Sequence, residues 1–254
     1  MILGEGSVLL LLLLTVLYLT FRAIRRDLAL ARTQQNFLLA VTHELRTPIA
    51  AIKLQLQTLA RPGLTTEQRE LLRTQAVDEA DRLAHLTDKV LMATRADEGG
   101  LELHPVRTDI MDLLHRSVER ARTQLAPHHT LKLEGPGELL VQVDPQALRS
   151  IVDNLLENAA KYAPAGTTID VTVVAGQDGW RLTVADEGPG IPEEDRQRIF
   201  EKFYRAGTEE TRNAKGTGLG LYIVERLVRQ LGGNITVKQR APQGAIFAAS
   251  FPNR

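Results

Sequence analysis

The chain has 254 residues, enough for one or two domains with a substantial hydrophobic core. Its 31 Lys and Arg residues balance its 31 Asp and Glu residues, so it lacks the basic excess that nucleic-acid phosphates call for, and we expect no nucleic-acid partner. With 43% hydrophobic and 24% charged residues, the composition excludes wholesale disorder. The absence of cysteine excludes disulfides, thiol catalysis and cysteine-ligated metal sites.

The first 21 residues are predicted to form a transmembrane helix. Within residues 2–21 the only side chain that is charged at neutral pH is Glu5, and about twenty helical residues span one bilayer core. A cleaved signal peptide needs basic residues before the apolar run and a small-residue cleavage site after it, and neither is present. Because Arg22, Arg25 and Arg26 follow directly, the positive-inside rule places the remainder in the cytoplasm. With so few residues before this run, we expect no extracytoplasmic sensor domain in this chain.

A heptad pattern typical of a coiled coil follows, with seam residues separated by alternating steps of four and three. The seam consists of Ile24, Leu28, Ala31, Gln35, Leu38, Thr42, Leu45, Ile49, Ile52, Leu56 and Leu59. Residues 61–63 (Arg-Pro-Gly) end this helix, and Thr65 with Gln68 is a capping box that begins a second helix reaching Gly99. Two such helices form a hairpin with one apolar face uncovered, so we expect a homodimer built on a four-helix bundle.

From about His104 onward, helical and strand patterns are interleaved. We expect helices over residues 108–126, 145–163, 193–200 and 219–231, and strands over 131–133, 139–143, 169–174, 181–185, 235–239 and 245–251. Asp144 and Pro145 are a typical N-cap and first helical residue, and residues 176–179 (Gly-Gln-Asp-Gly) indicate a hairpin turn. This order predicts an α+β sandwich with a mixed sheet.

Residues 43–48, His-Glu-Leu-Arg-Thr-Pro, lie within the first hairpin helix. The heptad register puts His43 at the solvent edge of the seam, and Thr47, one turn later, on the same helical face. A histidine beside the carboxylate of Glu44 is a candidate nucleophile with a neighbouring general base. Pro48 removes a backbone hydrogen bond and loosens the turn that contains His43. Taken alone, the pair fits a solvated His–Glu pair on a bundle better than a catalytic one.

Asn154, Asn158 and Lys161 form one stripe at i, i+4 and i+7 of the helix expected over residues 145–163. Asparagine is a weak helix former, so an ordinary solvent face would favour other residues. Two amide oxygens one turn apart, with an ammonium one turn further, suit a hydrated Mg²⁺ and the phosphates it carries. A plain polar outer face is the alternative, and the stripe alone does not choose between them.

Two glycine-rich loops flank a segment that contains aromatic residues. Residues 186–191 (Asp-Glu-Gly-Pro-Gly-Ile) follow a strand, and residues 216–221 (Gly-Thr-Gly-Leu-Gly-Leu) open a helix whose free N–H groups make an anion site. Either loop alone is a weak indication. Between them, residues 200–205 (Phe-Glu-Lys-Phe-Tyr-Arg) precede a polar stretch to Lys215, which we expect to be a mobile lid.

Together and in this order, these motifs resemble those of the bacterial sensor histidine kinases over residues 36–251. Residues 43–48 are similar to the family's H box, 154–162 to its N box, 186–190 to G1, 200–205 to the F box and 216–220 to G2. The resemblance implies a membrane-anchored α plus α+β chain, with a helical hairpin that dimerises into a four-helix bundle and an α/β-sandwich (Bergerat-type) ATP-binding domain like that of gyrase. It also implies a single-pass protein of the bacterial inner membrane with its catalytic part in the cytoplasm.

The domain limits expected from this resemblance are a transmembrane helix over residues 1–21, a juxtamembrane coiled-coil linker over 22–36, a dimerisation and histidine phosphotransfer domain over 37–100 and an ATP-binding catalytic domain over 101–254. The implied function is an ATP-dependent protein histidine kinase, which autophosphorylates on His43 and passes the phosphoryl group to an aspartate of a response regulator. Dephosphorylation of the same regulator is also implied.

The resemblance assigns roles to individual residues. His43 attacks the γ-phosphate of ATP, Glu44 accepts its proton, and Thr47 positions the water that dephosphorylates the regulator. Asn154 and Asn158 hold Mg²⁺. The further residues implied to bind ATP are Lys161 and Tyr162, Asp186 (on the adenine amino group), Gly188, Gly190, Phe203, Arg205, Lys215, Gly216, Gly218, Leu219 and Gly220.

One departure from the family's motifs and two alternative functions accompany this interpretation. Ala245 follows Gly244 where the family usually carries threonine, so one hydroxyl is missing and we expect weaker ATP binding without its loss. The related ATPases carry a water-activating glutamate where this chain has Asn154, which disfavours a membrane-anchored ATPase. The remaining alternative is a regulatory interaction protein that keeps the fold and binds or dephosphorylates the regulator without ATP-driven transfer.

Overall fold

The computed structural model describes residues 2–97, 102–205 and 217–253, without the side chains of residues 2–11, 29–30, 32–34, 36–37, 40 and 97. The chain forms two compact units, Met1–His43 and Glu44–Arg254. The first contains most of the long N-terminal helix, and the second contains the end of that helix and every other described element.

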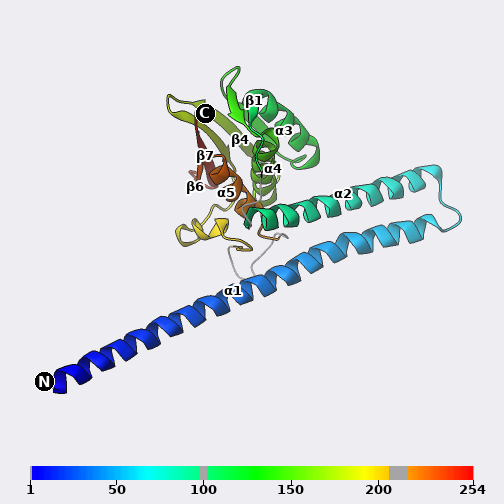
Figure 1. Cartoon of the computed structure of the whole chain (residues 1–254). Coiled ribbons are helices and arrows are strands. Elements are labelled where there is room, and N and C mark those ends of the chain that lie inside the picture. The colour runs from blue at the N-terminus through cyan, green and yellow to red at the C-terminus, as the bar shows by residue number, and fades with distance from the viewer. Residues whose placement is uncertain (1, 98–101, 206–216, 254) are drawn as a thin grey trace. The chain divides into compact units, whose positions relative to one another are not determined.

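Two long helices form the N-terminal part of the chain (Figure 1). They are α1 (Ile2–Leu59) and α2 (Thr66–Asp97), joined through Gly63, whose φ of 90° suits glycine. The predicted capping box is confirmed: the Thr65 N–H donates to Gln68 Oε1 (3.0 Å), and the Gln68 N–H donates to Thr65 Oγ1 (3.3 Å). These reciprocal bonds satisfy two N–H groups at the start of α2.

The predicted membrane span, residues 1–21, falls partly outside the described side chains, which begin at Leu12. In the part of the chain that the structure describes, no helix is both long enough and apolar enough to cross a bilayer.

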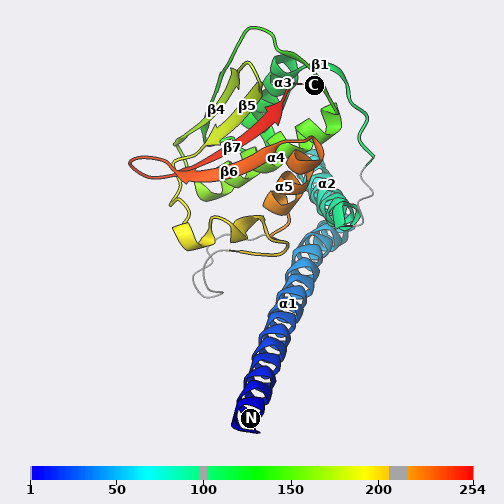
Figure 2. The ribbon, with the colours of Figure 1, turned by 60° about the vertical axis from the view of Figure 1, so that its left-hand side comes forward.

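The C-terminal part is an α/β sandwich, as the sequence predicted. Its elements are β1 (Val106–Asp109), α3 (Ile110–Gln124), β2 (Thr130–Glu134), β3 (Leu140–Val143), α4 (Pro145–Tyr162), β4 (Thr168–Ala175), β5 (Gly179–Ala185), η1 (Glu193–Asp195), η2 (Arg198–Phe200), α5 (Gly220–Gln230), β6 (Asn234–Gln239) and β7 (Ala245–Pro252). The large sheet has the order β2-β4-β5-β7-β6, with β2 parallel to β4 and the other pairs antiparallel. Helices α3, α4 and α5 pack against one another and on one face of this sheet (Figure 2).

Alternation along the strands fixes which face of the sheet is buried. In β5 the buried residues are Trp180, Leu182 and Val184, and in β7 the buried positions also alternate. The apolar side of α4 contributes fully buried residues such as Leu155 and Leu156 to the same core. This packing fixes the ends of β5 and α4, where the candidate site lies.

The predicted cap of α4 is confirmed. Asp144 Oδ1 accepts hydrogen bonds from the N–H groups of Gln146 (2.8 Å) and Ala147 (2.9 Å), and Oδ2 accepts one from the His104 N–H (2.8 Å). Burial alone raises the pKa of Asp144, but these three donors outweigh it and lower the pKa below its usual value. The cap therefore ties the connector at His104 to the start of α4.

Two predicted elements are wrong in extent or type. Thr108 and Asp109, expected in a helix, lie in β1, which pairs with β3, and Asp109 Oδ1 caps α3 by accepting from the Met111 N–H at 3.0 Å. The helix expected over residues 193–200 is replaced by the short turns η1 and η2. Only Ile199 is buried in those turns, so packing offers little to offset the cost of nucleating an α-helix.

Candidate active site

The predicted phosphoacceptor residues lie on α1. His43 and Thr47 both have exposed side chains, as the heptad register predicted. The Glu44 side chain is only 16% exposed and lies 3.8 Å from the guanidinium Nη2 of Arg82 on α2. Glu44 is therefore held by a loose ion pair within the hairpin.

Asn154 on α4 is buried, with 7% of its surface exposed, so a polar outer face is the wrong description of this position. Its Nδ2 donates to the Ser150 carbonyl at 2.8 Å, and its Oδ1 is buried with no hydrogen-bond partner among the described residues. A Cβ on Gly220, the first residue of α5, would lie 3.1 Å from that Oδ1. Asn154 therefore directs an unsatisfied acceptor to the start of α5, while Asn158, one turn on, is half-buried.

The second glycine loop and the aromatic segment lie against each other. The Phe203 N–H donates to the Gly218 carbonyl at 3.2 Å, and a Cβ on Gly218 would come within 2.8 Å of the Phe203 carbonyl carbon. Gly218 has a φ of 70°, and Phe203, with φ 68°, occupies a region rarely adopted by residues other than glycine. Leu219 is buried and anchors the loop before α5 begins, whereas Lys215 and Gly216 lie outside the described residues.

Tyr204 anchors the same segment from its other side. Its hydroxyl donates to Asp195 Oδ1, and the guanidinium of Arg198 lies 4.3 Å from its ring centroid. The turns η1 and η2 therefore hold the aromatic segment beside the glycine loop. Arg205, the last described residue before the gap at 206–216, is half-buried.

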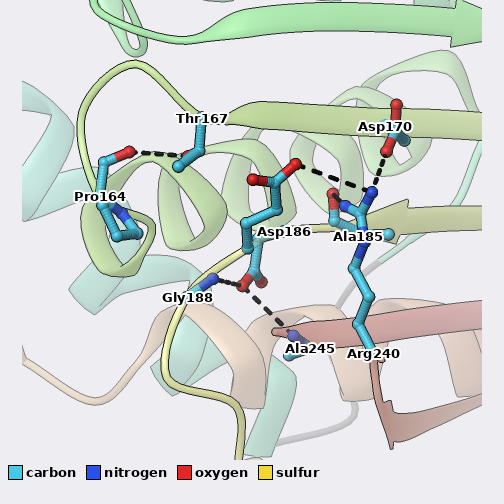
Figure 3. A network of polar contacts seen from close by, with 9 residues as sticks. Pro164, Thr167, Asp170, Ala185, Asp186, Gly188, Arg240 and Ala245 are labelled. Atoms are coloured by element: carbon cyan, nitrogen blue, oxygen red, sulfur yellow. Dashed lines mark hydrogen bonds and ion pairs between the residues drawn. The ribbon is translucent and has the colours of Figure 1, made fainter. Parts of the chain in front are cut away.

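Asp186, at the end of β5, is the most buried carboxylate of the predicted site, with 3% of its surface exposed. Its Oδ1 accepts hydrogen bonds from the N–H groups of Gly188 (2.8 Å) and Ala245 (3.3 Å), as Figure 3 shows. Oδ2 takes no hydrogen bond from the described residues. Burial raises the pKa of Asp186 above its usual 3.8, against the two N–H donors and the charge of Arg240. The site thus holds one carboxylate oxygen and leaves the other for a ligand donor.

Glycine allows the first glycine loop to approach the end of α4. A Cβ on Gly188 would lie 2.9 Å from Asp186 Oδ1 and 3.0 Å from the carbonyl oxygen of Tyr162. Gly190 has a φ of 78°, and a Cβ there would meet the amide of Gln239 at 2.4 Å. The predicted residues of the loop and of the helix are therefore neighbours in the fold.

Lys161 and Tyr162 form the end of α4 next to this loop. The Lys161 Nζ lies 5.0 Å from the Tyr162 ring centroid, and 42% of the Tyr162 surface is exposed. Although the Lys161 side chain as a whole is exposed, desolvation of its ammonium and then the Arg205 guanidinium lower its pKa to about 8. The Lys161 ammonium therefore lies in a partly desolvated environment near the Arg205 guanidinium, and two cationic side chains of this kind suit a phosphate group.

The structure thus groups the predicted residues of α4, the loop after β5 and the start of α5. It also adds two residues that the sequence did not single out for a site. Gln239, the last residue of β6, lies next to Gly190, and Arg240, which follows β6, contacts Ala185 and Glu187. No sequence motif indicates these two residues, because only the order of the strands in the sheet brings the end of β6 next to the loop after β5.

Comparison with known proteins identifies both halves of this arrangement. The model of the His Kinase A (phospho-acceptor) domain matches residues 33–99, and that of the histidine kinase-, DNA gyrase B-, and HSP90-like ATPases matches residues 143–254. The signal transduction histidine-protein kinase/phosphatase MprB of Mycolicibacterium smegmatis is 33% identical over 235 residues, which are 88% of this chain and 46% of that protein. The chain spans about half or less of the curated relatives it matches.

Two solved structures share the fold and 30% of the aligned sequence. The mycobacterial sensor histidine kinase MprB matches with a TM-score of 0.52 over 59% of this chain and 99% of its own. Full-length ShkA, solved in complex with AMPPNP, matches with a TM-score of 0.62 over 86% of this chain and 46% of its own. With a phospho-acceptor segment that carries His43 and an ATPase-like segment that carries Asn154, Asp186 and Gly218, this chain belongs to the sensor histidine kinases.

Proposed function

We propose that the chain is an ATP-dependent protein histidine kinase that phosphorylates itself on His43 and passes the phosphoryl group to an aspartate of a cognate response regulator. The observation that carries this proposal is the presence, in one chain, of an exposed histidine in a phospho-acceptor segment and of a buried carboxylate, Asp186, with one oxygen open to a ligand. ShkA, which matches most of this chain, binds the ATP analogue AMPPNP, and this supports ATP as the donor.

In the proposed reaction an imidazole nitrogen of His43 attacks the γ-phosphorus of ATP. The new N–P bond forms as the bond to the β,γ-bridging oxygen breaks and ADP leaves. Glu44 accepts the proton that the imidazole loses. Asp186 accepts a hydrogen bond from the adenine amino group, and Lys161 pairs with phosphate. The N–H groups at the start of α5 donate to a phosphate oxygen.

The residues of α4 fit a Mg²⁺ ion. The buried Oδ1 of Asn154 has no partner among the described residues, and an amide oxygen is a ligand that Mg²⁺ accepts. We propose that Asn154 and Asn158 hold this ion, which when bound neutralises phosphate charge. Asn158→Ala should therefore abolish phosphoryl transfer. Nucleotide binding should be measured separately with and without Mg²⁺: the metal should strengthen binding to the wild-type chain and leave binding to Asn158→Ala unchanged.

The experiment that tests the kinase proposal is incubation with γ-labelled ATP. The wild-type chain should acquire an acid-labile, base-stable label, as a phosphoramidate does, and His43→Ala should acquire none while still binding ATP. His85→Ala, an exposed histidine on α2, is the matched control and should label normally. Label that is acid-stable, or that persists in His43→Ala, contradicts the proposal.

The second candidate is a regulatory protein that binds or dephosphorylates the regulator without transferring phosphate from ATP. Ala245 favours it, since the buried alanine places no hydroxyl beside Asp186. The same labelling experiment separates the two functions. ATP binding without label on a well-folded chain supports the regulatory one.

We also propose a homodimer, with the domain limits 1–21, 22–36, 37–100 and 101–254 set out above. A shallow groove on α1 supports it, because this groove is lined by three residues of the predicted seam, Ile49, Ile52 and Leu56. Of these, Ile49 and Leu56 are more than half exposed in the single chain. A partner helix that covers this face would bury them, and sedimentation of the chain without residues 1–21 should give the mass of a dimer.

The inner-membrane anchor, residues 1–21, belongs to the same proposal and rests on the apolar run and on the three arginines after it. Extraction of membranes with alkaline carbonate tests it. The full chain should stay in the membrane pellet, and the chain that begins at residue 22 should be released. Release of both would show that the run is no anchor.

A further inference from the structure

Arg240, which follows β6, joins three segments around Asp186 (Figure 3). Its Nη2 lies 2.6 Å from Asp170 Oδ2 on β4 and 3.9 Å from Glu187 Oε1, and its Nη1 donates to the Ala185 carbonyl at 3.3 Å. Asp170 and Ala185 are register partners of neighbouring strands. One guanidinium therefore bridges β4, β5 and the two residues on either side of Asp186.

The turn that begins at Arg240 also supports Asp186 through the backbone. The Arg240 N–H donates to the Gly244 carbonyl at 3.0 Å and closes the turn before Ala245, whose N–H donates to Asp186 Oδ1. A Cβ on Gly244 would lie 2.0 Å from the Asp186 carbonyl oxygen, so turn and loop are in direct contact. A change at Arg240 can therefore displace the Ala245 N–H, which is one of the two donors that orient the Asp186 carboxylate.

The charges around Asp186 give Arg240 a second role. Both described ion pairs of Asp170 and Glu187 go to Arg240. Without this guanidinium, Asp170 and Glu187 would lose these ion pairs, and Asp186 would lose the positive charge that acts against the effect of its burial. The protonated form of this buried carboxyl group would then be favoured. Arg240 is 23% exposed, so its charge is only partly screened by solvent.

The protonation state of Asp186 decides which purine the site accepts. An ionised carboxylate is only an acceptor, which suits the 6-amino donor of adenine and repels the 6-oxo group of hypoxanthine or guanine. A protonated carboxyl group can donate and so tolerates a 6-oxo group. Correct orientation of Oδ2 matters equally, because a misplaced acceptor loses the hydrogen bond that discriminates.

We propose that Arg240 is a positioning residue that makes the nucleotide site select a 6-aminopurine over a 6-oxopurine. It acts by fixing the orientation and the charge of Asp186 without touching the nucleotide. The inference rests on the proposed function, in which Asp186 receives the adenine amino group.

The test measures the Kd of ATP and of inosine triphosphate, which differ at the 6-position, on the full chain and its variants. Arg240→Met should weaken ATP binding, leave inosine triphosphate binding unchanged or stronger, and so lower the selectivity ratio by about tenfold. Arg240→Lys keeps the positive charge but loses the planar guanidinium, and its selectivity ratio should lie between those of the wild-type chain and Arg240→Met. Arg181→Met is the matched control, since Arg181 contacts Ser250 across the same sheet (Nε to Oγ, 3.1 Å) and should leave the ratio at its wild-type value.

Each outcome decides the inference. A merely structural role would weaken both nucleotides equally and lower the melting temperature in parallel, and this result overturns the proposal. Should Arg240→Met fail to fold, a wild-type ratio in Arg240→Lys overturns it as well. If the wild-type chain binds neither nucleotide, the proposed function fails first. If the wild-type chain binds ATP and transfers its γ-phosphoryl group, but all variants have the same selectivity ratio, only this inference fails.

Discussion

The backbone of Ala245 holds Asp186 on both sides: the Ala245 N–H donates to Asp186 Oδ1 at 3.3 Å, and the Asp186 N–H donates to the Ala245 carbonyl at 2.9 Å. Neither bond needs the side chain of residue 245. Alanine, at a position where the sequence resemblance implies threonine, therefore keeps the scaffold of the carboxylate and lacks only the hydroxyl and methyl groups of that side chain. This is the physical reason to expect weakened ATP binding without its loss.

Asp186→Asn should weaken ATP binding by about 10- to 100-fold, the range for a lost hydrogen bond to a charged group. The amide can still accept from the Gly188 N–H, so the loop should keep its conformation, but it presents an amino group where the adenine amino group needs an acceptor. Calorimetric titration with ATP measures the loss. An unchanged affinity in a variant with the wild-type melting temperature would place the adenine elsewhere.

ATP binding should weaken on the alkaline side as Lys161 loses its proton. Its pKa is lowered to about 8, so the ammonium is charged below this pH and neutral above it. Affinity for ATP should therefore fall as the pH rises through 8 in the wild-type chain, and Lys161→Met should show lower affinity throughout without this alkaline fall. Titrations from pH 6.5 to about 9.5 test it, and an equally steep fall in both proteins would assign the titration to another group.

Gly244→Ala should destabilise the fold by about 3 kcal/mol or more, through backbone strain and a clash. Its φ of 133° suits glycine, and a Cβ would lie 2.0 Å from the Asp186 carbonyl oxygen. Gly137→Ala is the control, since a Cβ there meets nothing within 4 Å. Urea unfolding of both variants gives the comparison, and equal stabilities would show that the turn can relax away from Asp186.

Asp144→Ala should cost about 1–2 kcal/mol of the free energy of unfolding, the usual range for a lost N-cap. The folded-state pKa of Asp144 is lowered, so its contribution is fully present above the usual value of 3.8 and is lost as the pH falls through the folded-state pKa. Asp144→Asn keeps an acceptor for the Gln146 and Ala147 N–H groups but cannot titrate. Urea unfolding should therefore show that the difference in the free energy of unfolding between the wild type and Asp144→Asn is smaller at pH 3 than at pH 7.

Thr47→Ala should separate kinase from phosphatase activity. His43 and Thr47 are both exposed and lie one turn apart on α1, so a regulator docked over His43 also covers Thr47. The hydroxyl can orient a water toward the regulator's phosphoaspartate, whereas autophosphorylation uses the His43 nitrogen. Dephosphorylation should slow by about 100-fold with autophosphorylation largely kept.

Both rates and the melting temperature should be measured on one preparation of Thr47→Ala. Equal losses in the two reactions, together with a lower melting temperature, would indicate that Thr47 only stabilises the helix before Pro48.

Local signals predicted most of the fold. The capping box at Thr65, the cap at Asp144 and the hairpin of β4 and β5 each depend on residues close in sequence, and all three are confirmed. The strand β1 was missed, since four residues without alternation become a strand only by pairing with β3. The prediction of a helix over residues 193–200 is wrong. This segment buries only Ile199, so packing does not stabilise a full α-helix there.

The site was predicted in its motifs but not in its supports. The stripe of Asn154, Asn158 and Lys161 is visible in sequence, yet the burial of Asn154 against Gly220 follows from how α5 packs on α4. Arg240 lies 54 residues beyond Asp186 and is brought to it by the order of β5, β7 and β6. Charge partners of this kind have no signature in a single sequence.

The close approach of Gly188 to two groups has a consequence for how this pocket can diverge. Any side chain at position 188 would press at once on the Asp186 carboxylate and on the carbonyl of Tyr162, the last residue of the helix that carries Asn154 and Asn158. A single substitution would therefore shift the groups proposed for the base and those proposed for the phosphates together. A change at position 188 cannot adjust one end of the nucleotide site without disturbing the other, so homologues that change their nucleotide preference should do so at other positions.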